Sequence, residues 1–277
     1  MSTWNFDITK TVFDNVSKAP YTNAAGATLA TPTFFSFMCL VNNDSALIAS
    51  SQAASYIYKY SFESGHDGEI NYLKDGYDAR SAQTSNMRSV CVDVTGKRWF
   101  CEGFFSQHEI IRGTTIDAAY DVGSIPAFSG SWLDELPYYA QNGYGLAVST
   151  DGTKVILLMG DTPRSLAQYT LSTPFLLSSA SIATTTVSMT GFSATATHWY
   201  SFAFSPDGYR MVFVGLDKVH VFDLSVPWSI ATMSLTGVYT APYTNLSGVC
   251  VNQAATKMYV SSSTSGAYLI YQFSLNE

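Results

Sequence analysis

Cysteine and histidine are the residue types best suited to metal binding or nucleophilic chemistry, so their spacing decides the first question. The chain holds four cysteines and four histidines. They form no Cys-x-x-Cys, His-x-x-x-His or His-Glu-x-x-His pattern, which are the spacings that zinc sites use. Cys39, Cys91 and Cys250 instead share one position of an internal repeat, which favours packing of a small apolar side chain. We therefore predict no metal site and no cofactor.

Acidic residues could support glycoside hydrolysis, which needs two carboxyl groups about 5–10 Å apart. The strands expected at the centre of the fold offer Asp93 and few other acids. Asp134-Glu135 falls in a loop, and Glu102 and Glu109 flank a hairpin. The Gly-x-Ser-x-Gly elbow of serine hydrolases and the Asp-x-Asp-x-Asp-Gly loop of calcium sites do not occur. We therefore predict a protein without catalytic residues.

Aromatic side chains are the strongest candidates for contact with a partner. They make up 14% of the chain, and several stand just before the first strands of the repeat described below. Tyr and Trp dominate the energetically important positions of protein interfaces. The alternative is that these rings pack between sheets or cap the core. The candidate partner-binding residues are Tyr138, Tyr139, Trp199, Tyr200 and Tyr243.

An internal repeat supplies the elements that must position these residues. Its clearest copies are residues 145–160 and 201–215, each a short strand, an Asp-Gly turn and a mostly apolar strand. Asp-Gly between two strands predicts a β-hairpin in which both turn residues often take positive φ. A third strand, a Ser-x-Pro-aromatic sequence and a fourth strand follow. The third and fourth strands are expected at 166–171 and 182–189 in one copy, and at 219–224 and 235–240 in the other.

Three weaker copies extend the repeat to the whole chain. Five units of four strands, at intervals of about 50 residues, predict an all-β fold, a single closed β-propeller domain over residues 1–277. Five blades are preferred, and six is the alternative because blades of about 40–45 residues are common. The last copy stops after its third strand, and the sequence around Trp4 resembles the one that follows other third strands. An N-terminal strand is therefore expected to complete the last blade and close the ring. The small residue of each first strand is Cys39, Cys91, Ala147, Ala203 or Cys250.

Two short sequences carry a resemblance to a known family. The Ser-Pro-Asp-Gly turn at 205–208 and the Leu-Ser-Thr-Pro-Phe element at 171–175 resemble propeller repeats of the YVTN type. They are most similar to the Leu-Ser-Thr-Pro-Trp-rich variant of bacteriophage structural proteins and some bacterial surface proteins. The resemblance is clear over residues 144–240, and the Trp-Asp dipeptide of WD40 repeats is absent. It implies a virion component or an adhesion-like module, and it transfers no catalytic residues.

Charge and hydropathy limit the partners further. The net charge is −7 and the longest basic group is Lys97-Arg98, so nucleic acid is not an expected partner. No apolar run of 18 residues predicts membrane insertion, and the N-terminus has no signal-peptide pattern. We therefore predict a non-enzymatic virion protein of a bacteriophage, a tail- or capsid-associated structural, assembly or attachment protein that contacts other virion proteins. The alternative is a lectin-like module that binds a surface glycan, in an extracellular or cytoplasmic location.

Overall fold

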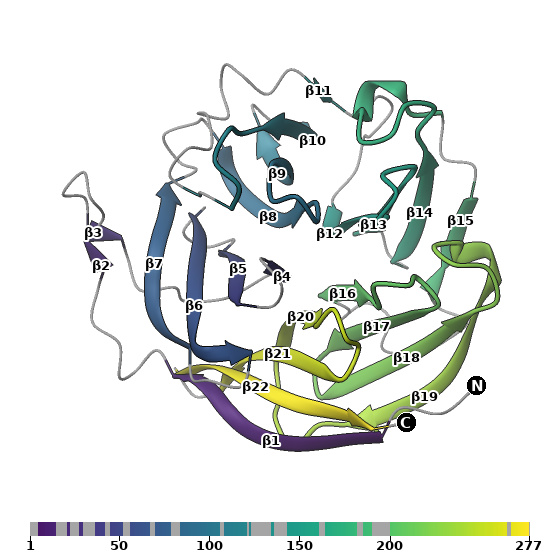
Figure 1. Ribbon diagram of the computed structural model, residues 1–277. Coiled ribbons are helices and arrows are strands. Elements are labelled where there is room, and N and C mark those ends of the chain that lie inside the picture. The colour runs from purple at the N-terminus through teal and green to yellow at the C-terminus, as the bar shows by residue number, and fades with distance from the viewer. Residues whose placement is uncertain are drawn as a thin grey trace.

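Antiparallel β-sheet makes up nearly all the regular structure of the computed structural model (Figure 1). Its described part contains five four-stranded sheets and one two-stranded sheet. The helical elements in that part are two 3-10 turns, η4 (Leu177–Ser179) and η7 (Ile230–Thr232). The structure describes residues 5–14, 21–22, 28–29, 37–41, 45–51, 56–66, 70–78, 84–105, 108–120, 122, 134–135, 143–160, 164–181, 185–189, 200–264 and 267–276.

Each four-stranded sheet is built mainly from consecutive strands of the chain. The first sheet holds β4 (Phe37–Val41), β5 (Ala46–Ser51), β6 (Tyr56–His66) and β7 (Ile70–Asp78). The second holds β8 (Thr84–Val92), β9 (Arg98–Phe105), β10 (His108–Thr115) and β11 (Asp134–Glu135). The third holds β12 (Gly143–Val148), β13 (Lys154–Met159), β14 (Ser165–Thr170) and β15 (Thr185–Ser188). The fourth holds β16 (Ser201–Phe204), β17 (Arg210–Gly215), β18 (Lys218–Leu224) and β19 (Met233–Thr240). The fifth holds β20 (Leu246–Val251), β21 (Lys257–Thr264), β22 (Ala267–Asn276) and β1 (Asn5–Asp14), and the two-stranded sheet holds β2 (Tyr21–Thr22) and β3 (Thr28–Leu29).

Strand β1 is the outer strand of the fifth sheet, although it stands at the opposite end of the sequence from its partner. It pairs antiparallel with β22, with Asn5 opposite Asn276 at one end and Asp14 opposite Leu269 at the other. The predicted pairing of the N-terminal segment with the last strand is therefore confirmed. It covers an edge of β22 whose N–H and C=O groups would otherwise be open to another chain.

The five large sheets follow one another around a common centre, each with one strand nearest to it (Figure 1). These inner strands are β4, β8, β12, β16 and β20, each at an edge of its own sheet. Neighbouring inner strands contact one another in that order, and β20 also contacts β4. The fold is therefore all-β and propeller-like, as the repeat predicts.

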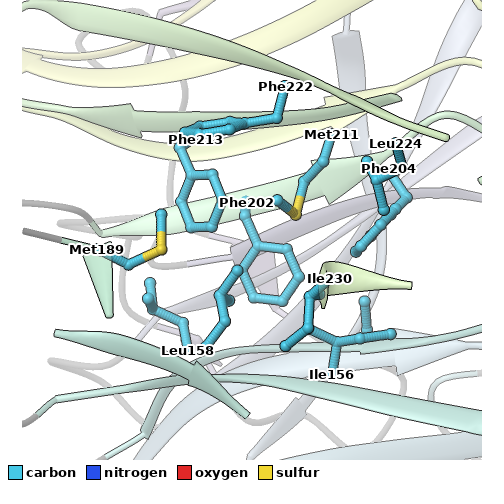
Figure 2. Close-up of a cluster of buried hydrophobic side chains, with 12 residues drawn as sticks. Ile156, Leu158, Met189, Phe202, Phe204, Met211, Phe213, Phe222, Leu224 and Ile230 are labelled. Atoms are coloured by element: carbon cyan, nitrogen blue, oxygen red, sulfur yellow. The ribbon is translucent and has the colours of Figure 1, made fainter. Parts of the chain in front are cut away.

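Five clusters of buried apolar side chains, counted among the described residues, fill the spaces between neighbouring sheets. Figure 2 shows one of them, in which Leu158 of the third sheet packs with Phe202 and Phe213 of the fourth. Another cluster contains Leu47 of the first sheet and Tyr259 of the fifth. Burying a large apolar side chain contributes about 1.5–3 kcal/mol. The first and last sheets are thus held together by the same kind of core as consecutive sheets.

A four-residue turn joins the inner strand to the next strand in the second to fifth sheets. Its fourth residue has φ between +54° and +75° and donates its N–H to the first residue's C=O at 2.8–2.9 Å. The predicted Asp-Gly hairpins are confirmed, but positive φ at both residues is wrong, because only the glycine takes it. The aspartate instead accepts local bonds: Asp151 accepts from the Ser149 hydroxyl at 2.6 Å and from the Thr153 N–H at 3.0 Å. The fourth residues are Gly96, Gly152, Gly208 and Ala255.

An aromatic ring covers each of the three turn glycines. A Cβ placed on any of these glycines would approach the ring closer than 3.0 Å. The residue that carries the ring donates its backbone N–H to the glycine C=O at 2.8–2.9 Å, and its own φ lies between +57° and +64°. The Ser-x-Pro-aromatic sequences therefore have a structural role, which is to bring a ring onto the turn. The pairs are Tyr120 with Gly96, Phe175 with Gly152 and Trp228 with Gly208.

All four cysteines are free thiols. Cys39, Cys91 and Cys250 pack in three different spaces between neighbouring sheets, as their shared repeat position predicts. Full burial is confirmed for Cys250 but is wrong for Cys39 and Cys91, which are half-buried. Burial still raises the pKa of the Cys91 thiol to about 11.

Candidate binding site at the strand-start rim

One rim of the five-sheet arrangement lies where the inner strands begin, and we call it the strand-start rim. In the third sheet the start of β12, the end of β13 and the start of β14 meet there, because Met159 lies opposite both Gly143 and Ser165. Arg164 directly precedes β14, and Tyr144 is the second residue of β12. Tyr200 directly precedes β16 of the next sheet. Three elements from two sheets therefore bring these side chains to one place.

Arg164 packs its guanidinium group against tyrosine rings. Its Cζ lies 3.8 Å from the centre of the Tyr144 ring and 5.4 Å from the centre of the Tyr200 ring. Only 7% of the Arg164 surface is exposed. A cation over a tyrosine face is attracted by the negative charge of the ring face, and the attraction grows when water is excluded. The two tyrosines thus stabilise a buried positive charge.

A second arginine reaches the same place from the second sheet. The Cζ of Arg88, in β8, lies 4.9 Å from the centre of the Tyr144 ring. Its Nη1 donates a hydrogen bond to the Gly143 carbonyl oxygen at 2.9 Å. We call Arg88, Tyr144, Arg164 and Tyr200 the Arg–Tyr cluster. It joins three consecutive sheets at the strand-start rim.

The electrostatics of the Arg–Tyr cluster are unusual because two cations share it. Burial lowers the pKa of Arg164, the two tyrosines act in the opposite direction, and the positive charge of Arg88 lowers that pKa further. Within the described residues, the Arg164 Nη1 is buried without a hydrogen-bond partner, and no carboxylate pairs with this arginine. By contrast, Arg210 pairs with Asp223 at 3.1 Å. Within the described residues, Arg164 therefore holds a positive charge that no carboxylate compensates.

The structure describes two of the five predicted partner-binding residues, and these two lie in different places. Tyr200 lies in the Arg–Tyr cluster and is half-buried. Tyr243 is also half-buried and stacks on Tyr271, with ring centres 3.6 Å apart and planes 10° apart, against the core between the fourth and fifth sheets. The other three predicted residues, Tyr138, Tyr139 and Trp199, lie outside the described residues.

Sequence reasoning missed both arginines of the cluster. Arg88 and Arg164 are far apart in the chain and occupy different positions of the repeat. Tyr144, by contrast, stands before a first strand like the other aromatic candidates. The aromatic candidates share a local sequence pattern, because each stands just before a first strand of the repeat. The arginines reach the tyrosines only through contacts between sheets. No spacing in the sequence could have found them.

The opposite rim, formed by the four-residue turns, is also aromatic, because Tyr120, Phe175 and Trp228 cover its glycines. Aromatic rings therefore lie at both rims, and at this one the reason is the ring-on-glycine packing. Cations of one sheet reach the aromatic loop of the next at this rim. The Lys154 ammonium donates to the Pro227 carbonyl oxygen at 3.1 Å, and the Arg98 Cζ lies 4.5 Å from the Phe175 ring centre.

Two other titratable side chains of the described residues, those of His220 and Glu102, are buried within the sheets. His220 is buried in β18, and burial lowers its pKa, so it is neutral at pH 7. Glu102 is buried in β9 and accepts a 2.7 Å hydrogen bond from the Ser89 hydroxyl. No three histidine, cysteine or acidic side chains of the described residues lie close enough to hold a metal ion. None of the helices in this part has the length and apolarity needed to cross a bilayer.

Comparison with known proteins gives structural similarity without sequence similarity. No family model and no curated protein matches the chain. A functionally unknown protein from Desulfotomaculum acetoxidans has a TM-score of 0.49 and 12% identity, over 83% of this chain and 80% of its own. A chain in the crystal structure of the mitotic checkpoint complex has a TM-score of 0.49 and 9% identity, over 91% and 69%. A candidate 6-phosphogluconolactonase from Bacteroides fragilis has a TM-score of 0.49 and 13% identity, over 80% and 62%.

Proposed function

We propose that the chain is a closed five-bladed β-propeller that forms one domain over residues 1–277 and serves as a rigid, non-enzymatic binding body. Support for closure comes from the core shared by the first and fifth sheets and from the pairing of β1 with β22. Each of the five large sheets then packs on two neighbours. Such a body deforms little and presents its two rims to partners.

The observation that carries the proposal is the distribution of polar and reactive side chains between the two rims. Two cations at the turn rim, Lys154 and Arg98, contact the aromatic loop of the next sheet. The cysteines and His220 are packed between or within sheets. Among the described residues, the Arg–Tyr cluster combines half-exposed aromatic rings with the charge of Arg164, which no described carboxylate pairs. The strand-start rim is therefore the contact surface.

The proposed partner is another protein of a bacteriophage particle, in the tail or the capsid, so the proposed location is the virion. This part rests on the resemblance of residues 171–175 and 205–208 to propeller repeats of phage structural proteins. The test is sedimentation of particles from cells that produce the tagged protein. Wild-type protein is expected to sediment with particles. Protein that stays in the supernatant of an intact particle preparation would contradict the proposal.

Substitutions of aromatic residues distinguish loss of contact with the partner from loss of folding. Trp199→Ala and Tyr139→Ala, both outside the described residues, are expected to abolish co-sedimentation and leave the melting curve unchanged. Tyr243→Ala is the matched control, because Tyr243 stacks on the buried Tyr271 and packs against the core. It is expected to lower the melting temperature. Equal loss of stability in all three variants would make the first two residues core positions.

A second candidate is a lectin-like, carbohydrate-binding module. The Arg–Tyr cluster favours it, since aromatic faces and cations side by side can contact the rings and acidic groups of sugars. The test is binding of the purified protein to an array of neutral and acidic glycans. Binding that Tyr200→Ala removes would support this function over docking within a particle.

A further inference from the structure

Arg164 carries a buried charge that no other described residue neutralises. The residue is 7% exposed, its Nη1 has no hydrogen-bond partner, and within the described residues no carboxylate pairs with it. Buried charges are ordinarily paired, because removal of an ion from water is unfavourable unless other groups replace the lost hydration. The faces of Tyr144 and Tyr200 replace part of it and leave one N–H direction unused.

The positive charge of Arg88 makes it more unfavourable for the Arg164 N–H to lack an acceptor. Two guanidinium groups over one tyrosine ring repel each other, which raises the free energy of the empty site. An anion bound at Arg164 would offset this repulsion. Arg98 and Arg210, unlike Arg164, are paired with carboxylates, Asp93 and Asp223 respectively. Within the described residues, the Arg164 charge is thus left for an anion that comes from outside the chain.

We propose that the Arg–Tyr cluster binds an oxyanion, the carboxylate or phosphate group of a small ligand, at Arg164 and Arg88. A guanidinium group matches the geometry of both anions and can donate two parallel hydrogen bonds to either. Burial of Arg164 limits access to a terminal group, and the net charge of −7 disfavours a long polyanion. The proposal goes beyond the binding function above and does not depend on association with a particle.

The test is thermal unfolding of the full chain at pH 7, with sodium chloride replaced at constant ionic strength by sodium phosphate or sodium glucuronate. A bound anion stabilises the folded state by mass action. At concentrations far above the dissociation constant, the melting temperature of the wild type is expected to rise by about 3 °C or more. Glucose is the uncharged comparison for glucuronate and is expected to give no rise. A response to phosphate alone identifies a phosphate-bearing ligand, and a response to glucuronate alone an acidic sugar.

Three variants assign the effect to the site. Arg164→Gln is expected to abolish the rise, and Arg88→Gln to reduce the apparent affinity at least tenfold. Arg98→Gln is the matched control, because Arg98 also lies over an aromatic ring but at the turn rim. It is expected to keep the full rise. If Arg164→Gln does not fold, the Arg88→Gln variant, which changes a half-buried residue, tests alone whether the cluster binds the anion. A wild-type rise no larger than that in chloride, or the same rise in Arg88→Gln, would overturn the proposal, whatever the result of the particle assay.

Discussion

Substitution of Gly208 by alanine tests the ring-on-glycine packing at the turn rim. Gly208 has φ +75°, and a Cβ at this position would overlap the Trp228 ring. Trp228 in turn stacks on Phe204, with ring centres 4.4 Å apart and planes 25° apart. An added methyl group therefore meets two obstacles, the backbone conformation and a ring that cannot move without losing its own partner.

The energetic cost of the backbone conformation and that of displacing the ring can be estimated separately. An alanine held at positive φ costs about 1–2 kcal/mol relative to glycine. Displacement of Trp228 from Phe204 forfeits an aromatic pair, which contributes about 0.5–1.5 kcal/mol. The free energy of unfolding is therefore expected to fall by about 1.5–3.5 kcal/mol in Gly208→Ala. For a chain of this size that corresponds to a drop in melting temperature of about 3–14 °C.

The fifth sheet supplies the control, because the same turn position is naturally an alanine there. Ala255 has φ +54°. Ala255→Gly removes the unfavourable conformation and is expected to raise the free energy of unfolding by about 0.5–1 kcal/mol. Urea unfolding of both variants, followed by tryptophan fluorescence and circular dichroism, measures the two changes, and they should have opposite signs.

A double-mutant cycle separates the ring from the backbone. In a Trp228→Ala background the overlap is gone, so Gly208→Ala should cost only the backbone term, about 1–2 kcal/mol. An equal cost of Gly208→Ala with and without Trp228 would falsify the idea that the ring covers this glycine.

Three further predictions follow from strand pairing and from buried titratable groups. Deletion of residues 1–14 removes β1 from the edge of β22 and is expected to lower the melting temperature and promote aggregation; a truncated protein as stable as the full chain would contradict this. Burial holds the Cys91 thiol protonated to about pH 11, so the free energy of unfolding should fall between about pH 9 and pH 11, where the unfolded chain ionises first. The decline should flatten in Cys91→Ala, since alanine occupies the same repeat position at Ala147. Burial lowers the pKa of His220, so stability should also fall as the pH drops below about 6.5, and urea titrations at pH 7 and pH 5 should show a smaller difference in His220→Gln.

The strands and their pairing could be predicted because their signals are local or periodic. Asp-Gly between apolar runs placed the hairpins at Gly152 and Gly208, and the repeat placed the third and fourth strands. The pairing of β1 with β22 followed from continuity of the repeat across the two ends of the sequence. These features depend on the order of residue types along the chain and on its repetition, and both can be read from a single sequence.

The Arg–Tyr cluster could not be predicted, because it depends on how sheets face one another. Arg88, Arg164 and Tyr200 come from three sheets, and the distances that join them arise only after the sheets are packed. The covering of Gly152 by Phe175 was missed for a related reason. The Pro-aromatic sequence was visible, but its backbone conformation at positive φ was not.

The pairing of β1 with β22 has a consequence for how the protein is made. A ribosome produces β1 first and β22 last, so during synthesis the N-terminal strand has no partner of its own. Its final contact has nearly the largest sequence separation that the chain allows, and contacts of this kind form slowly. Until then the strand can pair with the same edge on a second chain whose own β1 has not yet paired, in a strand-exchanged dimer. High expression is therefore expected to yield some dimer that reverts to monomer after unfolding and refolding at low concentration.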